Sequence, residues 1–319
     1  MNAMCRLSIV IETDNASHTS FARMAQLLSA LRDQLAAARV SAEILVMHDP
    51  ARVTKAALDA LIAGAGLGPA SEPTGMSHSL IGGDYYSMKN EGCRLARGEL
   101  VLLIDSDIVP EPGFLQAMLC PFDDPAIAVV AGSPYVHPRR SLLAKASALY
   151  WMFPLRAAGG PLEPSSSMYA NTVVVRREVL RAHPFPTNDG YRAQTDMLAR
   201  ELRQAGIAIW RAPGALAAHP PPRSWRAAIE RALWEGHDRL VDRPLARQRP
   251  ATPARAARGL LISADEHWRR FKREWRQAGL GPHELPLALA IALGFELAVR
   301  VGFALSSRDR RLLARVLDR

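Results

Sequence analysis

The amino-acid sequence predicts an α/β fold in which a mostly parallel sheet is flanked by helices. Short apolar segments at 7–11 and 42–47 are each followed by a segment with helical spacing, and such alternation is typical of parallel sheets. A continuous apolar run at 100–104 has the character of a strand buried on both faces. The basic and apolar region 223–319 predicts a helical extension after this sheet.

The individual elements follow from periodicity and from turn residues. Apolar residues spaced by three and four predict a helix from Phe21 to Leu35, with its start supplied by 17–20. Residues 64–84 are rich in Gly, Pro and Ser and predict a loop, and Pro213-Gly214 predicts a turn. The remaining predictions are helices at 53–62, 85–95, 114–119, 140–153, 177–181 and 195–204, and strands at 127–131, 168–175 and 207–211.

The net charge of +9 is distributed unevenly along the 319 residues. Residues 1–219 hold 20 Lys+Arg and 20 Asp+Glu, whereas residues 220–319 hold 20 and 11. A neutral body therefore precedes a basic tail. A basic segment of this size is attracted to nucleic acid or to an anionic membrane surface.

Three widely spaced cysteines indicate a reducing compartment. Cys5, Cys93 and Cys120 form neither a disulfide framework nor a C-x-x-C metal pair. The first strand-like segment begins by Leu7 without a preceding apolar leader, so we expect no signal peptide. These observations predict that the protein stays on the cytoplasmic side of the cell membrane.

Two carboxylates follow the apolar run at 100–104. Residues two apart at the end of a strand point the same way, so Asp105 and Asp107 can converge on one spot. Hard oxygen ligands of this kind suit Mg²⁺ or Mn²⁺ carrying a diphosphate. The alternative is that Asp107 only caps the helix that begins near Phe114. The dinucleotide-binding fingerprint and the P-loop motif are both missing from the sequence.

The ordered set of motifs resembles family 2 of the inverting nucleotide-diphospho-sugar glycosyltransferases, which have the GT-A fold. The resemblance spans the first two thirds of the chain and implies a catalytic domain at 1–222 and a C-terminal helical region at 223–319. The segments that carry it are Ser8–Asn15, Glu43–Asp49, Lys89–Gly92, Ala96–Glu99, Asp105–Asp107, Asn171 before Arg176-Arg177, Thr195-Asp196, Gly206 and His219.

The resemblance implies roles for individual residues. Thr13 and Asp49 would face the base of the donor nucleotide, Lys89 the nucleotide, and Asp105 its ribose or the metal. Asp107 would hold a divalent metal, Mg²⁺ or Mn²⁺, on the donor diphosphate, and His219 would add an imidazole ligand to this metal or contact a phosphate. Asp196 would be the general base that takes the proton of the acceptor hydroxyl.

Each role has a structural alternative. Thr13 can serve a turn, Asp49 can form an Asx-turn before Pro50, and Lys89 can be a solvated helix residue. Asp196 can be a favourable charge at a helix start, and His219 can be purely structural.

The sequence also departs from the family pattern. Glu12 stands where Pro is common, and His48 stands where a first Asp is common, which weakens the expectation about base recognition. Thr195 replaces the usual acidic neighbour of the base, so Asp189 is the fallback base.

The basic tail has two features typical of membrane association. Leu261, Ala264, Trp268, Phe271 and Trp275 repeat at three and four among cations, as in a helix lying in a membrane interface. The run 285–305 is long enough to cross a bilayer, although it contains Glu296 and Arg300, which lie four apart. The alternative is a buried helix packed on the body.

These observations lead to three hypotheses from different classes. The first is a metal-dependent, inverting glycosyltransferase that uses a nucleotide-sugar, a UDP-sugar being favoured. It would act at the inner face of the membrane on a lipid-linked or saccharide acceptor in envelope polysaccharide or glycolipid synthesis. The second is a non-catalytic sugar-nucleotide-binding scaffold of the same fold. The third is a nucleic-acid binder, but the aromatic stripe and apolar run fit lipid better, so we expect no nucleic-acid partner.

Overall fold

The computed structural model describes residues 6–15, 21–71, 73–151, 155–156, 159–242 and 265–317. They form two compact units, which are described separately. The sheet unit comprises Met1–Pro134, Arg156–Thr187 and Thr195–His219, and the helical unit comprises Tyr135–Leu155, Asn188–Gln194 and Pro220–Arg319. The predicted helix start at 17–20 and the first residues of the predicted aromatic stripe, Leu261 and Ala264, lie outside the described residues.

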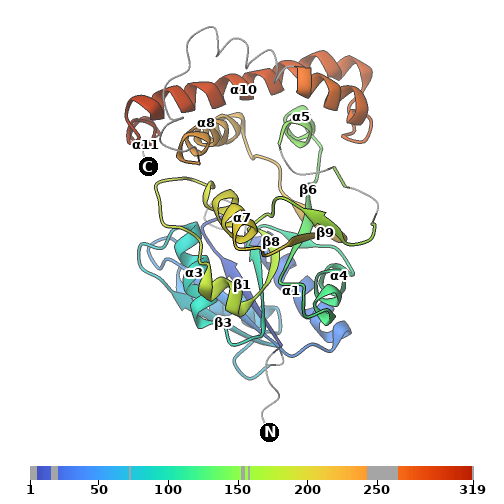
Figure 1. Ribbon diagram of the computed structural model, residues 1–319, viewed down its shortest axis with the longest axis vertical. Helices are drawn as coiled ribbons and strands as arrows, with labels where there is room; N and C mark the ends of the chain where they lie inside the picture. Colours follow the sequence, from blue (N-terminus) through green and yellow to red (C-terminus); the bar gives the residue numbers. More distant parts are fainter. Residues whose placement is uncertain are drawn as a thin grey trace. The chain divides into compact units, whose positions relative to one another are not determined.

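The sheet unit is built on a mixed sheet in which the described residues form nine strands (Figure 1). Its path runs β3-β2-β1-β4-β8-β6-β9-β5, with β7 paired to β9. The four strands at one side of this path are mutually parallel, and β8, β6, β7 and β5 join by antiparallel pairing where their register is defined. The strands are β1 (Leu7–Glu12), β2 (Ala42–His48), β3 (Thr74–Ser79), β4 (Leu100–Asp105), β5 (Val109–Pro110), β6 (Val129–Val136), β7 (Glu163–Ser165), β8 (Thr172–Arg176) and β9 (Ile209–His219).

Helices cover both faces of this sheet, which explains the continuous apolar runs. Alternate residues of β1 enter different layers: Ile9 packs with the apolar residues of α1, and Val10 packs with those of α3. One layer contains α1 (Phe21–Ala38), α2 (Lys55–Gly64) and α4 (Phe114–Leu119), and the other contains α3 (Tyr85–Leu95), α6 (Arg177–Ala182) and α7 (Gln194–Gln204). The prediction of an α/β sheet flanked by helices is therefore confirmed.

A predicted loop and a predicted turn were wrong, because both contain strand residues. β3 lies inside the predicted loop 64–84, because its sequence Thr-Gly-Met-Ser-His-Ser lacks the apolar pattern of a central strand and β3 sits at the sheet edge. The predicted turn at Pro213-Gly214 is instead part of β9. Pro213 has no backbone N–H to donate to a neighbouring strand. It is tolerated because it lies between the stretch of β9 that pairs with β7 and the stretch that pairs with β5.

Gly92 and Gly98 of the sheet unit lie where a neighbouring element leaves no room for a side chain. A Cβ on Gly92 of α3 would lie 2.3 Å from a methyl carbon of Val10, and a Cβ on Gly98 would lie 2.5 Å from the backbone nitrogen of Ser8. The Ser8 hydroxyl accepts from the Gly98 N–H at 2.8 Å and donates to Glu43 at 2.6 Å. Burial alone would raise the pKa of Glu43, but hydrogen bonds from Ser8 and Arg97 hold this pKa below its usual value. This network fixes the entry into β4.

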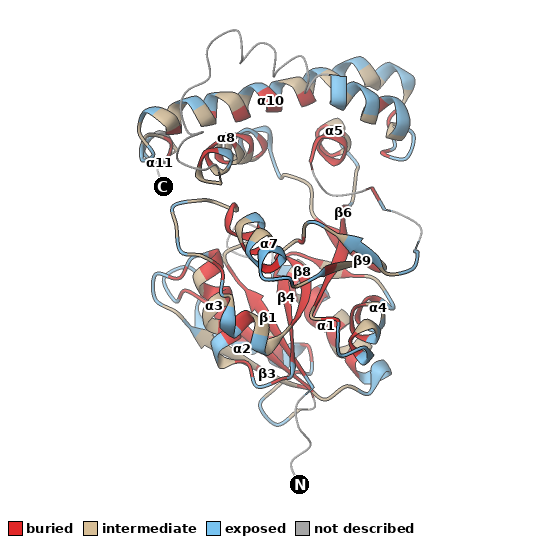
Figure 2. Ribbon diagram, in the orientation of Figure 1, coloured by how far each residue is buried: buried red, intermediate tan, exposed pale blue. Residues whose placement is uncertain are grey.

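The helical unit contains α5 (Leu142–Tyr150), α8 (Trp225–Val241), a helix over 265–274, a short 3-10 turn η3 (Pro282–Glu284), α10 (Leu285–Arg308) and α11 (Leu312–Val316). Within this unit α10 lies across α8 and α5 (Figures 1 and 2). The predicted pairing of Glu296 with Arg300 is confirmed at 2.7 Å. Phe271 is buried, so its predicted role as a membrane anchor is wrong, whereas Trp268 is half exposed.

Replacing Gly98 by Ala should destabilise the protein by about 1–3 kcal/mol, because the added methyl group meets backbone rather than a flexible side chain. Urea unfolding measures this change. The matched control is Gly64→Ala at the exposed end of α2, where a Cβ meets nothing within 4 Å and helix propensity favours Ala. Equal stability of the two variants would contradict the close approach at Gly98.

Candidate functional site

Polar side chains gather where the parallel strands end. The strand order reverses between β1 and β4, and Glu12 at the end of β1 pairs in register with Asp105 at the end of β4. Thr13 follows β1 and Asp49 follows β2 at the same edge of the sheet. In open α/β sheets, ligands bind outside the carboxyl ends of the strands at such a reversal. This edge is therefore the candidate functional site.

Asp105 is held by three donors, two from α3 and one from the loop after β1. Its Oδ1 accepts from the Lys89 ammonium group at 2.8 Å and from the Tyr85 hydroxyl at 2.8 Å, both on α3. Its Oδ2 accepts from the Asn15 side-chain amide at 2.8 Å, in the loop after β1. These three donors fix the orientation of the carboxylate.

Lys89 is fully buried, and its ammonium group bonds to Asp105 and to the carbonyl of Ala170 at 3.0 Å. The alternative that Lys89 is a solvated helix residue is therefore wrong. The structure gives Lys89 the task of fixing Asp105, and a direct contact with a nucleotide stays a prediction.

Asp107 and His219 are brought to the same end of the sheet by a short strand pair. β5 and β9 run antiparallel with Val109 opposite Ala218, so the residues before Val109 lie beside the residue after Ala218. Arg23 of α1 reinforces this pairing, because its guanidinium donates to the backbone carbonyls of Asp107 and Ala218. Both Asp107 and His219 are buried.

This donor set fits a divalent metal that is shared with a phosphate-bearing substrate. In the described part of the chain, His, Cys, Asp and Glu side chains form no group of three or more that could hold a metal ion. Mg²⁺ is commonly bound through one or two carboxylates together with substrate phosphates, and carboxylate oxygens also suit Mn²⁺. Asp107 and His219 are thus the residues that would hold such an ion.

The loops after β1 and β2 are tied to each other. The backbone N–H of Thr13 donates to the backbone carbonyl of Met47 at 3.1 Å, and the Arg52 guanidinium pairs with the Asp14 carboxylate at 2.5 Å. Asp49 accepts from the backbone N–H of Ala51 at 3.0 Å, which is the Asx-turn expected before a proline. These contacts shape the wall of the site next to β2.

His48 replaces an acidic residue of the family pattern, and the structure gives it internal partners. Its Nδ1 lies 2.8 Å from the carbonyl of Val53, and its Nε2 lies 3.0 Å from the Ser79 hydroxyl. His48 is also fully buried. It therefore joins β2 to β3, and the loop after β2 keeps Asp49 as its acidic group.

The two candidate bases have different surroundings. Asp196 lies exposed in the first turn of α7, where the helix dipole favours its negative charge. The preceding Thr195 is held by the Tyr86 hydroxyl of α3 at 2.7 Å. Asp189, the fallback base, belongs to the helical unit and pairs with Arg310 at 3.3 Å.

The loop 189–193 before α7 is anchored by side chains of α8. The Asp238 carboxylate accepts from the backbone N–H groups of Tyr191 at 2.6 Å and Arg192 at 2.7 Å, and His237 Nε2 lies 2.8 Å from the Asp189 carbonyl. Burial raises the pKa of Asp238 to about 7, against the lowering effect of these N–H donors. Sequence patterns give no signal for this anchor, since its partners lie more than 40 residues away.

Three further residues of the site were missed from sequence. Arg23 and Tyr85 lie on helices, where the apolar spacing makes Arg23 an ordinary surface position and Tyr85 an ordinary core position. Asn15 is the last residue of the motif Ser8–Asn15, in which no role was assigned to it. Only the geometry shows that each of them orients an acidic loop.

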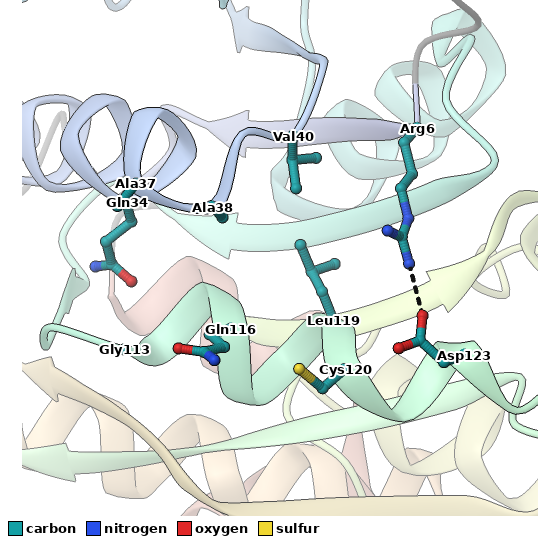
Figure 3. Close-up of a pocket in the computed structure, with 10 residues that line it drawn as sticks. All are labelled: Arg6, Gln34, Ala37, Ala38, Val40, Gly113, Gln116, Leu119, Cys120 and Asp123. Carbon is teal, nitrogen blue, oxygen red and sulfur yellow. Dashed lines mark hydrogen bonds and ion pairs between the residues drawn. The ribbon is translucent and has the colours of Figure 1, made fainter.

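A cavity of about 440 Å³ lies elsewhere in the sheet unit (Figure 3). It opens between α1 and α4 near Arg6, which precedes β1 and so marks the opposite end of that strand from Thr13. Arg6 pairs with Asp123 at 3.1 Å, and Gln34 bonds to the backbone of α4. The predicted site residues do not line this cavity.

The fold and the acidic strand ends define a class, the glycosyltransferases of family 2. The family model described as "Glycosyltransferase like family 2" matches residues 18–235, which is more than half of the chain. The chain therefore belongs to this family, and the prediction of a glycosyltransferase is supported at the level of sugar transfer in general.

Among solved structures, the chain is similar to the mannosyltransferase PcManGT from Pyrobaculum calidifontis in complex with GDP-Man and Mn²⁺. The TM-score is 0.54 at 16% sequence identity, with 99% of this chain and 79% of that chain covered. This likeness shows the fold. No curated protein sequence matches the chain.

Replacing Lys89 by Met should cost about 3–5 kcal/mol of folding stability, because it leaves the buried Asp105 without its counter-ion. Adding Asp105→Asn to Lys89→Met should recover part of this loss. Urea unfolding of the single and double variants measures the effect. Lys55→Met is the control, since Lys55 pairs with Asp59 at the surface and its loss should cost no more than about 1 kcal/mol. A Lys89→Met variant as stable as Lys55→Met would refute the buried ion pair.

Proposed function

We propose that this protein is a metal-dependent, inverting glycosyltransferase that moves a sugar from a nucleotide-diphosphate donor, a UDP-sugar being favoured, to a hydroxyl acceptor. The single observation that supports the proposal is that Asp105 ends β4 at the strand-order reversal of a family 2 fold, with Asp107 two residues further on and His219 directly after the stretch of β9 that pairs with β5. The acceptor class that we propose is a lipid-linked or saccharide acceptor of envelope polysaccharide or glycolipid synthesis.

In this proposal the loops after β1 and β2 receive the nucleotide. Thr13 and Asp49 contact the base, and Asp49 can accept from an N–H of a uracil-type ring. Asp105 accepts from the ribose hydroxyls or contributes to the metal site, and Lys89, Tyr85 and Asn15 keep its carboxylate in the required orientation.

Asp107 and His219 are the residues that would hold Mg²⁺ or Mn²⁺ for the donor diphosphate. When bound, the metal stabilises the negative charge that develops on the leaving nucleoside diphosphate. Arg23 keeps the two ligands in register, because it binds the backbone carbonyl of Asp107 and that of the residue before His219.

Asp196 removes the proton of the acceptor hydroxyl. As the acceptor oxygen forms its bond to the anomeric carbon, the bond from that carbon to the diphosphate breaks and the proton passes to the Asp196 carboxylate. A single displacement inverts the anomeric configuration. The exposed place of Asp196 in the first turn of α7 leaves it accessible to an acceptor.

The second candidate function is a sugar-nucleotide-binding scaffold without catalysis. A panel of UDP- and GDP-sugars separates the two, and the panel includes GDP-mannose because the similar solved structure holds it. Incubation with Mn²⁺ should release the free nucleotide from one donor by transfer or slow hydrolysis. Tight nucleotide binding without any release, with or without saccharide and lipid acceptors, would favour the scaffold.

Replacing Asp107 by Ala should abolish the Mn²⁺-dependent part of nucleotide binding, because the diphosphate charge loses its bridging ion. Calorimetric titration of UDP and GDP with and without Mn²⁺ measures this. Asp33→Ala, which removes an exposed carboxylate of α1, is the control and should bind as the wild type does. Unchanged Mn²⁺ dependence in Asp107→Ala would remove Asp107 from the metal site.

Replacing Asp196 by Asn should leave donor affinity nearly unchanged and reduce turnover about a hundredfold or more, because an amide keeps the shape but takes no proton. Steady-state transfer rates and nucleotide titrations separate these two effects. Asp189→Asn is the comparison. An active Asp196→Asn variant beside an inactive Asp189→Asn variant would move the base to Asp189.

A further inference from the structure

The outward face of α10 carries an apolar stripe. Its exposed positions recur at three and four, and two of its leucines, Leu287 and Leu297, are 59% and 57% exposed. A soluble helix normally places polar residues on such a face. Figure 2 shows exposed turns along this helix. The stripe comprises Pro286, Leu287, Ala290, Gly294, Leu297, Val301 and Ala304.

The opposite face of α10 is locked onto α8. A Cβ on Gly302 would lie 2.0 Å from the carbonyl oxygen of Leu233, and a Cβ on Gly236 would lie 2.0 Å from that of Val299. The two backbones are therefore in contact, and His237 Nδ1 lies 3.0 Å from the Ser306 hydroxyl.

A buried cluster of charged side chains also stabilises the packing of α10 on α8. Glu296 is fully buried and pairs with Arg300 at 2.7 Å, also on α10, and with Arg239 of α8 at 3.7 Å. The Tyr150 hydroxyl of α5 lies 3.4 Å from Glu296. Separating α10 from α8 would take the Arg239 charge away from Glu296.

α8 is too polar to enter the hydrocarbon of a bilayer. Its 17 residues include six charged side chains and one histidine. By length and composition alone, the helix Pro282–Arg308 could cross a membrane, since it contains an 18-residue stretch with a mean hydropathy of 1.9. Crossing would drag α8 into the bilayer or break its contact with Gly302, and both are costly.

We propose that α10 lies in the plane of an anionic membrane, with its apolar stripe in the interface and its other face packed on α8. Charge complementarity supports this occupant, because residues 220–319 hold 20 Lys+Arg against 11 Asp+Glu. Exposed arginines gather just after the stripe at Arg308, Arg310, Arg311 and Arg315. Only the purpose of this membrane contact, which is access to a lipid-linked acceptor, rests on the proposed function.

The test is flotation of the full-length protein with vesicles of phosphatidylglycerol and phosphatidylcholine. Leu297→Glu should lower vesicle partitioning about tenfold or more, because a leucine no longer enters the interface. Ile81→Glu is the matched control, since Ile81 is 87% exposed in the sheet unit and the change in charge is the same. Leu287→Glu is the second variant. Point variants are preferred to truncation, which would uncover α8.

The expected result is loss of flotation in both α10 variants, retention in Ile81→Glu, weak flotation with pure phosphatidylcholine, and release from membranes by alkaline extraction. Resistance to alkaline extraction would mean that α10 spans the bilayer and would overturn the proposal. So would a lipid-free dimer that Leu297→Glu converts to a monomer, since the stripe would then bind a second copy. Nucleotide titration of the same variants reports on the sheet unit, so a failure of the proposed transferase function is seen separately.

Discussion

The candidate site depends on the buried ion pair between Lys89 and Asp105. Lys89 comes from α3 and Asp105 from the end of β4, so the pair fixes a helix to the strand at which the sheet order reverses. Its cost of burial is offset by Tyr85, Asn15 and the carbonyl of Ala170, which complete the hydrogen bonding of both charges. These contacts hold the acidic group at the end of β4 in one orientation.

Sequence reasoning recovered the parts of this arrangement that local pattern controls. The strands at 7–12, 42–48 and 100–105 and the helix Tyr85–Leu95 follow from apolar periodicity, and the carboxylates at the strand ends follow from alternation along each strand. What pattern could not supply is long-range pairing. The two-residue strand β5 places Asp107 beside the end of β9, and neither the shortness of β5 nor the role of Arg23 leaves a trace in the sequence.

The same limit explains the helical unit. Composition identifies 285–305 as long and apolar, but it does not reveal which face of that helix is occupied. The contact of Gly236 and Gly302 with facing backbone, and the cluster around Glu296, arise only when α8 and α10 meet. Phe271 illustrates the same limit. Its spacing in the sequence suggested a stripe that faces a membrane interface, but its side chain is buried inside the helical unit.

We propose that the acidic strand ends bind a nucleotide diphosphate through a divalent metal. The most direct measurement is anomalous X-ray scattering at the manganese edge from crystals grown with Mn²⁺ and the nucleotide selected by the donor panel. Our account predicts one manganese peak in contact with Asp107 and His219, with the nucleotide against the loops after β1 and β2. A peak away from both residues, or a nucleotide in the cavity beside Arg6, would contradict it.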